Sequence, residues 1–394
     1  MTALMLPVLI GSAGLASDTI QMVFIKRVMQ RQADSSAIAG AFALSQGKAV
    51  AATVTADLAR TKGFPLSLTP VIENAPTVGA YAGNTKAVRV ALATDRDLPF
   101  LDMFMGKQRI SAEATAAVVG MGEHCALALD TSNTTGVRAG GSSIVNLNCG
   151  IMSNSISATA VTAGGSSLVK ASPVSAVGGV PASGNYAAGT ERFPYAVPQA
   201  DPFAALANPN IGNGSSSGNV NSNQTRSLSP GTYAGMDIKG TANLAPGTYF
   251  ISGGSLKINA GAVVNGTNVV FVLSSRNAAT SPSSIATVDI NGGATLNITA
   301  PSTGTYAGIL FFQDRRAIDS GSNKINGNST SRLQGAIYFP SQEVQFNGNS
   351  GINIACIKLV AKRLEFTGNS TITNVCPANS GVVSILGTKV KLVA

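Results

Sequence analysis

The sequence is poor in charged and aromatic residues. It has no tryptophan, aromatic residues make up 5% of the chain, and charged residues make up 11%, against about a quarter in an average globular protein. We do not expect a β-propeller, because its repeats usually carry aromatic signatures. Hydrophobic residues make up 44% of the chain, which argues against disorder, since disordered chains are poor in them.

Basic residues outnumber acidic ones but do not form a stripe. The formal net charge is +9, and the basic residues are scattered in small groups such as Lys26–Arg27, Arg315–Arg316 and Lys362–Arg363. A nucleic-acid-binding protein concentrates such residues on one face. We therefore expect no nucleic-acid partner, and only a general attraction to anionic envelope surfaces.

Zinc ligands are also scarce. His124 is the only histidine, and none of the four cysteines, Cys125, Cys149, Cys356 and Cys376, belongs to a CxxC pair. A structural zinc site usually needs closely spaced ligand pairs, so we expect no metal here. Two disulfides are the better interpretation, and they indicate an oxidising compartment.

What the sequence does contain begins with a helical pattern at the N-terminus. The run 1–16 is uncharged, and as a helix it would rise about 24 Å, short of the roughly 30 Å core of a bilayer. A signal peptide would begin with basic residues, whereas here they follow the run. Apolar residues continue at four-residue spacing, and neither Gly nor Pro interrupts 18–39. We predict an uncleaved membrane anchor whose anchor residues are Leu4, Leu6, Val8, Leu9, Ile10 and Leu15.

The charges and the cysteines disagree about the orientation of this helix. Lys26 and Arg27 follow the uncharged run, and by the positive-inside rule they oppose export of the C-terminal side. The cysteines favour export. We give the cysteines more weight, because a segment upstream of Met1 could carry the compensating charge.

The rest of the chain is repetitive. From Gly122 onwards, short apolar runs alternate with Gly, Asn and Ser. Units of this kind cannot bury their apolar side alone, so they stack and share one core. The sequence predicts a mainly β fold, with a right-handed parallel β-helix-like body after a long N-terminal helix and a small α+β module. The repeats are GGSS at 140–143 and 164–167, L-x-PGTY at 228–233 and 244–249, and NGNS or TGNS at 326–329, 347–350 and 367–370.

The cysteine spacings match the local repeats. Cys125 and Cys149 lie 24 residues apart, like the two GGSS repeats, and Cys356 and Cys376 lie 20 apart, like the last two asparagine repeats. Residues one coil apart stack at about 4.8 Å, which a disulfide tolerates. Of the three possible pairings we therefore predict these two, each worth roughly 3 kcal/mol.

Composition divides the chain into five parts. The tract GNGSSSGNVNSNQ in the fourth part is typical of a flexible linker. Seven N-x-S/T sequons are interpreted mostly as turn asparagines with left-handed backbone angles. The parts are a membrane-anchor helix with an Ala-rich extension (1–45), a small α+β module (46–120), the first β-helix coils (121–180), a Gly/Ser/Asn/Pro-rich loop or linker (181–226) and the main β-helix (227–394). The sequons are at Asn133, Asn213, Asn223, Asn265, Asn297, Asn328 and Asn369.

Two motifs could carry chemistry. Asp130 opens DTSNT after the apolar CALAL, and a carboxylate with nearby hydroxyls suits a hard cation. A polar turn is the simpler interpretation. A metal-binding loop of this kind should be followed by an amphipathic helix, and the following GVRAGGSS does not have that pattern. The second motif is FFQDRRAIDS, with Asp314, Arg315, Arg316 and Asp319.

Many parallel β-helices cleave glycans, with paired carboxylates or a basic residue as the catalytic groups. The C-terminal half has few acidic residues, so for the second motif we expect a surface that contacts solvent or a glycan. We predict no catalytic residue, no metal ligand and no cofactor. An adhesin-like glycan-binding β-helix is the alternative function, and a polysaccharide lyase or hydrolase is a third.

The N-terminal segment LPVLIGSAGLASDTIQMVFIKRVMQRQADSSAIAGAFAL resembles the start of TadE/TadG-like pilus-assembly proteins. In that family a membrane helix leads into an Asp-containing and then Ala-rich helix, here with Asp18 and Asp34. The segment 88–119 adds to the resemblance, which implies a strand over 88–93, a short helix over 98–105 and a strand over 110–119. The C-terminal half resembles the β-helical region attached to some TadG-like proteins.

The resemblance implies a non-enzymatic structural or assembly component of a Tad/Flp-type pilus. The protein would cross the bacterial inner membrane once, with its body in the periplasm or at the cell surface. Its pilin-like α+β module would contact other pilus-assembly subunits and the inner-membrane platform. The β-helix would serve as a spacer or contact surface.

Overall fold

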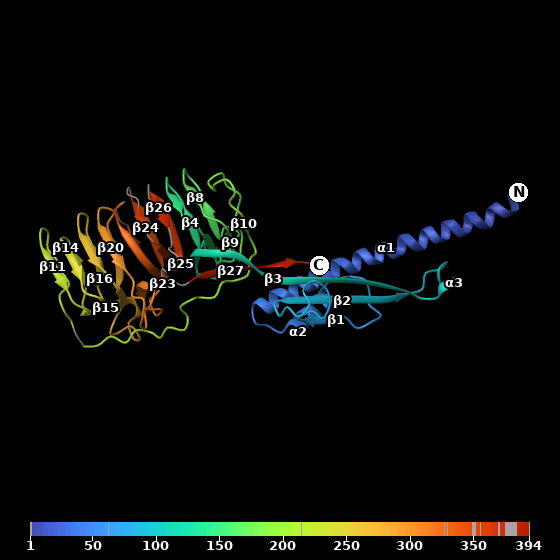
Figure 1. Cartoon of the computed structure of the whole chain (residues 1–394), viewed down its shortest axis with the longest axis horizontal. Helices are drawn as coiled ribbons and strands as arrows, with labels where there is room; N and C mark the ends of the chain where they lie inside the picture. Colours follow the sequence, from blue (N-terminus) through green and yellow to red (C-terminus); the bar gives the residue numbers. More distant parts are fainter. Residues whose placement is uncertain are drawn as a thin grey trace. The chain divides into compact units, whose positions relative to one another are not determined.

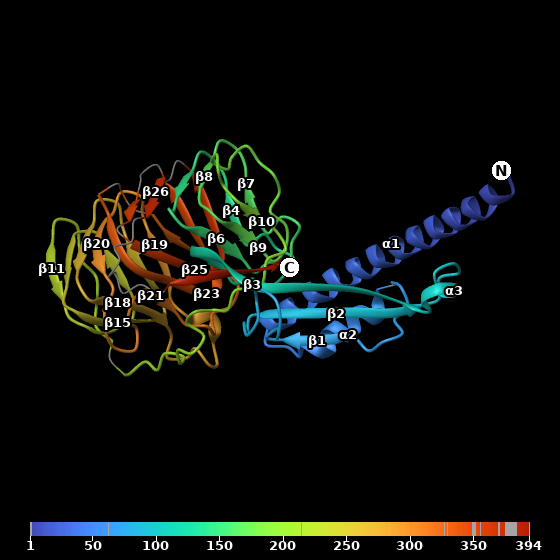
Figure 2. The same ribbon diagram turned by 45° about the vertical axis from the view of Figure 1, so that its right-hand side comes forward.

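The chain forms two compact units (Figures 1 and 2). The computed structural model describes residues 2–61, 63–213, 215–326, 328, 330–348, 352–354, 356–368, 371–374 and 384–393, with the side chains of α1 from Gly11 onwards. The first unit comprises residues 1–120 and 388–394, and the second comprises 121–387. The structure is mainly β, with a large and mostly parallel sheet and a long N-terminal helix.

The first unit packs a long helix on an antiparallel sheet. Strand β2 is antiparallel to both β1 and β3, which places the predicted strands at 88–93 and 110–119. The predicted helix at 98–105 is one short turn, α3. The elements are α1 (Thr2–Ser45), α2 (Val50–Arg60), β1 (Val71–Asn74), β2 (Ala87–Arg96), α3 (Asp102–Met105), the first part of β3 (Gln108–Ala128) and the end of β27 (Ile385–Leu392).

Small side chains allow α1 to approach the sheet closely. Ala33, Ala37 and Ala41 recur every four residues and are fully buried, so they form one stripe along the helix. A side chain on Gly40 would meet Val54 of α2 and Val88 of β2. The Ala-rich extension predicted from the sequence is therefore the packing face of α1.

The second unit repeats three strands at a time. Strand β15 pairs in parallel with β18, three strands further along the chain, and β16 and β17 pair in the same way with β19 and β20. The strands are β4 (Val137–Ala139), β5 (Ile144–Asn146), β6 (Gly150–Ser153), β7 (Val161–Ala163), β8 (Leu168–Lys170), β9 (Val174–Ala176), β10 (Arg192–Phe193), β11 (Thr225–Leu228), β12 (Gly231–Tyr233), β13 (Met236–Ile238), β14 (Thr241–Leu244), β15 (Gly247–Ser252), β16 (Ser255–Ile258), β17 (Val263–Gly266), β18 (Val269–Ser274), β19 (Thr287–Ile290), β20 (Thr295–Thr299), β21 (Ile309–Gln313), β22 (Ser322–Ile325), β23 (Arg332–Gly348), β24 (Ile352–Ile354), β25 (Cys356–Gly368) and β26 (Thr371–Asn374), with a 3-10 turn at Pro282–Ser284.

The sequence repeats correspond to the pairing registers. Leu228 pairs with Leu244, Ile144 with Leu168 and Phe346 with Phe366. These separations of 16, 24 and 20 residues are the periods of the three sequence repeats. The core between the strands also contains stacked rings, with centroids 5.9 Å apart for Tyr233 and Tyr249 and 5.5 Å apart for Phe271 and Phe311.

The two groups of repeats form one stack in an order that differs from the sequence. Strand β25 pairs with β23 on one side and with β3 and β4 on the other, so that Leu359 lies beside Ala126 and Leu364 beside Val137. In the stack, the C-terminal repeat that contains β25 therefore lies directly against the N-terminal repeat that contains β3 and β4. The first β-helix coils predicted at 121–180 and most of the main β-helix predicted at 227–394 belong to one compact unit.

This order requires a connection along the whole stack. Residues 196–213, here named the strap, run from the β10 end to the β11 end (Figure 1). Phe203 of the strap is buried, and its ring packs edge-on against Tyr338 at 5.1 Å. Arg315 donates hydrogen bonds to the carbonyls of Phe203 and Leu206. The strap lies within the predicted loop or linker at 181–226; it contains no helix or strand, and it is packed and hydrogen-bonded.

The strap explains why some strands have continuous apolar sequences. Strands β18 (VVFVLS) and β21 (ILFFQ) are buried at every position, as expected for parallel strands that are covered on both faces. Phe271 points into the core of the stack, whereas Val272 and Phe312 belong to a second cluster with Phe203 and Tyr338. The strap thus covers an apolar outer face of the sheet.

Two of the described sequon asparagines stand on strands and not in the predicted turns. Among the described sequons, Asn223 alone has a left-handed backbone, with φ of 62°. Asn265 and Asn297 stand on β17 and β20 and form an exposed ladder with Asn243, with amide hydrogen bonds of 3.1 Å. Parallel in-register stacking places identical side chains above one another, so these asparagines belong to the repeat and not to turns.

We predict that Arg315→Ala loosens the strap. Losing hydrogen bonds from a charged donor costs about 1.5 kcal/mol or more, so local opening should be at least about ten-fold more frequent. Limited digestion with thermolysin should then cut within 196–213 at least about ten times faster than in the wild type. Arg138→Ala is the control, because this side chain is 66% exposed and makes only an ion pair of 3.7 Å. Equal cleavage of both variants would contradict the role of Arg315.

Candidate functional site

The N-terminal half of α1 changes its surroundings near Ile25. Ile25 and Met29 are buried against the sheet, whereas Ile20 and Phe24, the latter directly before Ile25, are 69% and 62% exposed. Of the predicted anchor residues, Leu15 is described and is 48% exposed; the other five lie outside the described side chains. Among the described residues, no helix is both long and apolar enough to cross a membrane.

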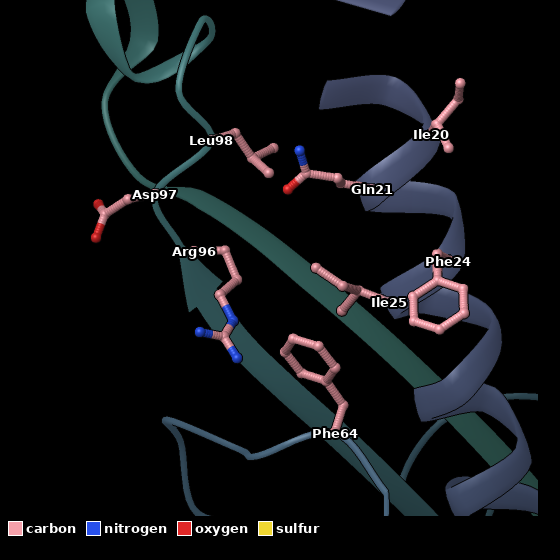
Figure 3. A pocket seen from close by; sticks show the side chains of 8 residues that line it. All are labelled: Ile20, Gln21, Phe24, Ile25, Phe64, Arg96, Asp97 and Leu98. Carbon is pink, nitrogen blue, oxygen red and sulfur yellow. The ribbon is translucent and has the colours of Figure 1, made fainter. Parts of the chain in front are cut away.

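A pocket of about 430 Å³ lies between this part of α1 and the end of β2 (Figure 3). Its walls are mostly apolar, and the guanidinium of Arg96 lies over the ring of Phe64 at 4.2 Å. The Arg96 Nε has no hydrogen-bond partner among the described residues. The lining residues are Ile20, Gln21, Phe24, Ile25, Phe64, Arg96, Asp97 and Leu98.

Asp18 attaches the hairpin between β2 and β3 to α1. Its carboxylate is buried, and Oδ2 accepts hydrogen bonds from the backbone N–H groups of Phe100 at 2.9 Å and Leu101 at 2.7 Å. One turn earlier, any side chain on Gly14 would collide with the ring of Phe100. The family resemblance named Asp18 only as part of a motif; the structure gives it a bonding role in positioning the hairpin.

The hairpin tip is the feature that sequence reasoning missed. Met103, Phe104 and Met105 of α3 are 76%, 82% and 70% exposed. Three consecutive large apolar side chains between two predicted strands were the available signal, but the sequence analysis predicted only a short helix over 98–105. In the structure α3 has one turn, and it buries none of these three side chains.

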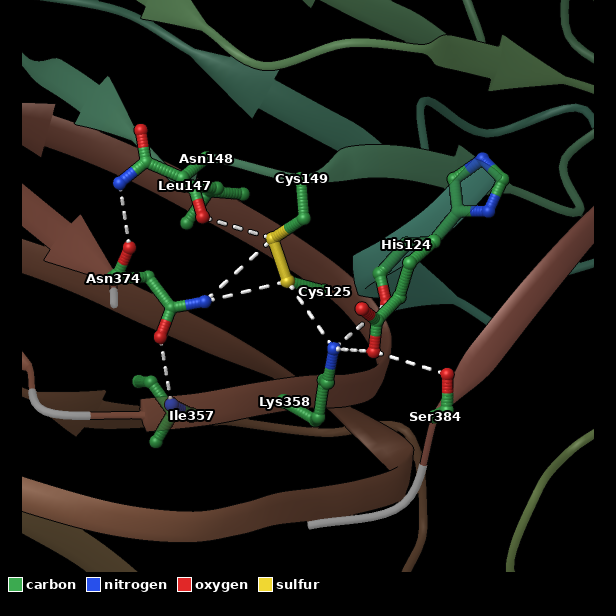
Figure 4. The surroundings of a disulfide bond; sticks show 10 residues. His124, Cys125, Leu147, Asn148, Cys149, Ile357, Lys358, Asn374 and Ser384 are labelled. Atoms are coloured by element: carbon green, nitrogen blue, oxygen red, sulfur yellow. Dashed lines mark hydrogen bonds and ion pairs between the residues drawn. A yellow bond between two sulfur atoms is a disulfide. The ribbon is translucent and has the colours of Figure 1, made fainter. Parts of the chain in front are cut away.

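The predicted disulfide between Cys125 and Cys149 joins β3 to the residue before β6, with Cα atoms 5.7 Å apart (Figure 4). The amide of Asn374 donates to both sulfur atoms, at 3.3 and 3.6 Å. Cys356 is buried, and its predicted partner Cys376 lies outside the described residues. The pairing of Cys356 therefore stays a prediction.

Lys358 lies beside this disulfide and is almost completely buried. Its ammonium is 2.5 Å from the Glu123 carboxylate and 3.4 Å from the Cys125 sulfur (Figure 4). The hydrogen bond from Lys358 lowers the pKa of Glu123. Because Lys358 comes from β25 and Glu123 from β3, this ion pair and the disulfide lie at the junction of the two groups of repeats. The spacing of the cysteines gave no signal for the lysine.

His124 is buried next to this junction. Burial, and secondarily the charge of Lys358, lower the pKa of its imidazole to about 4. Its Nε2 lies 3.4 Å from the Ser175 hydroxyl, and its Nδ1 has no partner among the described residues. The ring is therefore held neutral at pH 7.

The structure separates the four residues of the predicted surface site. Asp314 is buried, and its pKa is lowered because hydrogen bonds from Arg316 and Ser274 outweigh the effect of burial. Arg315 and Arg316 bind the strap. Asp319 instead pairs with Arg363 at 2.7 Å, which with Lys362 lowers its pKa to about 2. These side chains are engaged in internal contacts and do not face one common ligand site.

The motif at Asp130 forms a local turn. One carboxylate oxygen accepts the backbone N–H of Ser132 at 2.8 Å, and the other pairs with Arg363 at 2.9 Å. Among the described residues there is no group of three or more His, Cys, Asp or Glu side chains that could hold a metal ion. The arrangement matches the polar-turn interpretation of this motif.

The family models, curated proteins and solved structures with which the chain was compared gave no match.

We predict that Asp18→Ala destabilises the first unit by roughly 1–3 kcal/mol, because two backbone N–H groups lose their charged acceptor. Asp18→Asn should cost less, since it keeps an acceptor oxygen. Thermal unfolding followed by the circular dichroism of helices measures this, because the described α-helices belong to the first unit. Asp34→Ala is the matched control on the same helix, where the carboxylate accepts only from Gln30. Equal effects of Asp18→Ala and Asp34→Ala would refute the attachment.

We also predict a pH dependence that His124 alone causes. Its folded pKa of about 4 lies below the ordinary histidine value of 6.5, so the unfolded chain binds more protons between these values. Stability should therefore be complete above pH 6.5 and fall by up to about 3 kcal/mol as the pH drops towards 4. His124→Gln should flatten this part of a plot of melting temperature against pH. An unchanged slope would show that other groups cause it; Glu123, whose pKa is lowered, titrates at more acidic pH.

Proposed function

We propose that this protein is a non-enzymatic structural component of a membrane-anchored, pilus-type assembly that faces the periplasm or the cell surface. The proposal rests on the difference in burial between the two halves of α1. Its Ala-rich half, with Ala33 and Ala37, is buried on the sheet, whereas Ile20, Val23 and Phe24 are exposed. A soluble surface rarely exposes such a cluster without a binding role, so this half of the helix needs a membrane or a neighbouring subunit to cover it.

The second unit supports the structural part of the proposal. We interpret its stacked parallel repeats as a right-handed parallel β-helix, the usual hand of parallel crossover connections. The in-register pairing of three strands in each repeat and the stacked aromatic rings favour this interpretation. Such a body is a rigid spacer that presents long surfaces to other assembly subunits.

The disulfide supports the location outside the cytoplasm. Disulfides persist in oxidising compartments such as the periplasm, and Cys125 and Cys149 are joined. A single-pass anchor in the inner membrane, with the pilus platform and other subunits as partners, is part of the same proposal. A glycan-binding adhesin is less favoured, because Asp314, Arg315 and Arg316 contact the strap or each other.

The test is membrane retention in a bacterial host. Ile20→Ser combined with Phe24→Ser should reduce the fraction of full-length protein that stays with membranes after a high-salt wash by at least about ten-fold. Burial of each large apolar side chain is worth about 1.5–3 kcal/mol, so losing two of them exceeds that factor. Val78→Ser, at a residue 52% exposed in the same unit, is the control. Release of all three proteins by the wash would refute the membrane anchor, whereas equal retention of all three would show that Ile20 and Phe24 do not contribute to it.

A further inference from the structure

The turn between β2 and β3 ends in an exposed apolar tip. Met103, Phe104 and Met105 of α3, here named the tip, expose between 70% and 82% of their surface. Single exposed apolar residues are common, but adjacent large ones mark a contact surface. The tip is therefore a place where something apolar should bind.

The tip has a fixed position relative to α1. Asp18 holds the backbone of Phe100 and Leu101, and the ring of Phe100 lies against Gly14. Gly106, with φ of 68°, ends the short helix and turns the chain into β3. Figures 1 and 2 show α3 at the end of the hairpin that lies towards the N-terminus of α1. The tip thus lies next to the point where the uncharged run 1–16 ends.

The charges around the tip are neutralised at its base. Lys107 pairs with Asp97 at 3.3 Å, and Arg109 pairs with Asp95 at 2.9 Å. The apolar tip therefore lies beyond two ion pairs, and Asp102 of α3 adds an exposed carboxylate beside it. A protein partner would need a hollow of matching shape, whereas a fluid bilayer accepts such a tip directly, with its apolar part at the acyl boundary and the charges among the headgroups.

We propose that the tip inserts into the surface of a phospholipid bilayer and forms a second membrane contact beside α1. This inference rests on the membrane anchoring proposed above and adds a contact that α1 does not provide. The two contacts together hold the first unit against the membrane at a fixed orientation. Because the charges at the base are paired within the hairpin, the contact does not require anionic lipid.

Tryptophan fluorescence tests the contact directly, because the chain has no natural tryptophan. In the full-length protein, Phe104→Trp should shift its emission to the blue when phosphatidylcholine vesicles are added. Brominated acyl chains in those vesicles should quench it. Val78→Trp, on the surface of the same unit but away from the tip, should show neither effect. Ile20→Trp reports separately on α1.

A loss-of-contact variant complements the fluorescence. Met103, Phe104 and Met105 replaced together by Ser should leave the melting temperature unchanged, because the three side chains are exposed. The same variant should bind the vesicles at least about ten-fold more weakly in co-sedimentation, since three apolar side chains no longer leave water.

The outcomes separate the two proposals. If the vesicles sediment the protein and shift Ile20→Trp but not Phe104→Trp, the tip contact is overturned and the anchor stands. If the vesicles neither sediment the protein nor shift either tryptophan, the anchor is overturned and the tip contact with it. A blue shift of Phe104→Trp that grows with protein concentration without vesicles would overturn the lipid contact in favour of a second copy of the chain.

Discussion

The stacking of each repeat on the next is the constraint on which the second unit depends. A three-strand repeat presents apolar side chains such as Phe271 to its interior, and only another repeat in register completes the hydrogen bonds along its edges. The apolar outer face of the sheet must also be covered, and Phe203 of the strap packs against it. The disulfide and Lys358 then reinforce the one junction at which the stacked repeats are not consecutive in sequence.

In the first unit, the sheet covers the apolar side chains of only half of helix α1. The small residues Ala33 and Ala37 allow α1 to lie close to the sheet, and Met29 completes the interface. Ile20 and Phe24 have no such cover in the unit. Asp18 then brings a second exposed apolar element to the same end of the helix, so two uncovered apolar surfaces lie at this end of the first unit.

Periodicity made the stacking predictable, but not its order. The spacings of 16, 20 and 24 residues gave the registers within each group and selected Cys125 with Cys149. No repeat connects Leu359 with Ala126, so the junction had no signal. The packing of the strap could not be predicted from the sequence, because it depends on Phe203 and on Arg315, which lies more than 100 residues later. The internal contacts of the motif at Asp314 gave no sequence signal either, since Ser274 and the strap carbonyls bound by Arg315 and Arg316 are distant in sequence.

The junction also has a consequence for the timing of folding. Lys358 follows its partner Glu123 by 235 residues, so the repeat that contains Glu123 acquires its neighbour only when almost the entire chain has been synthesised. Contacts between such distant segments make folding slow. Until β25 has been synthesised, β3 and β4 lack the neighbour that completes the hydrogen bonds along this edge.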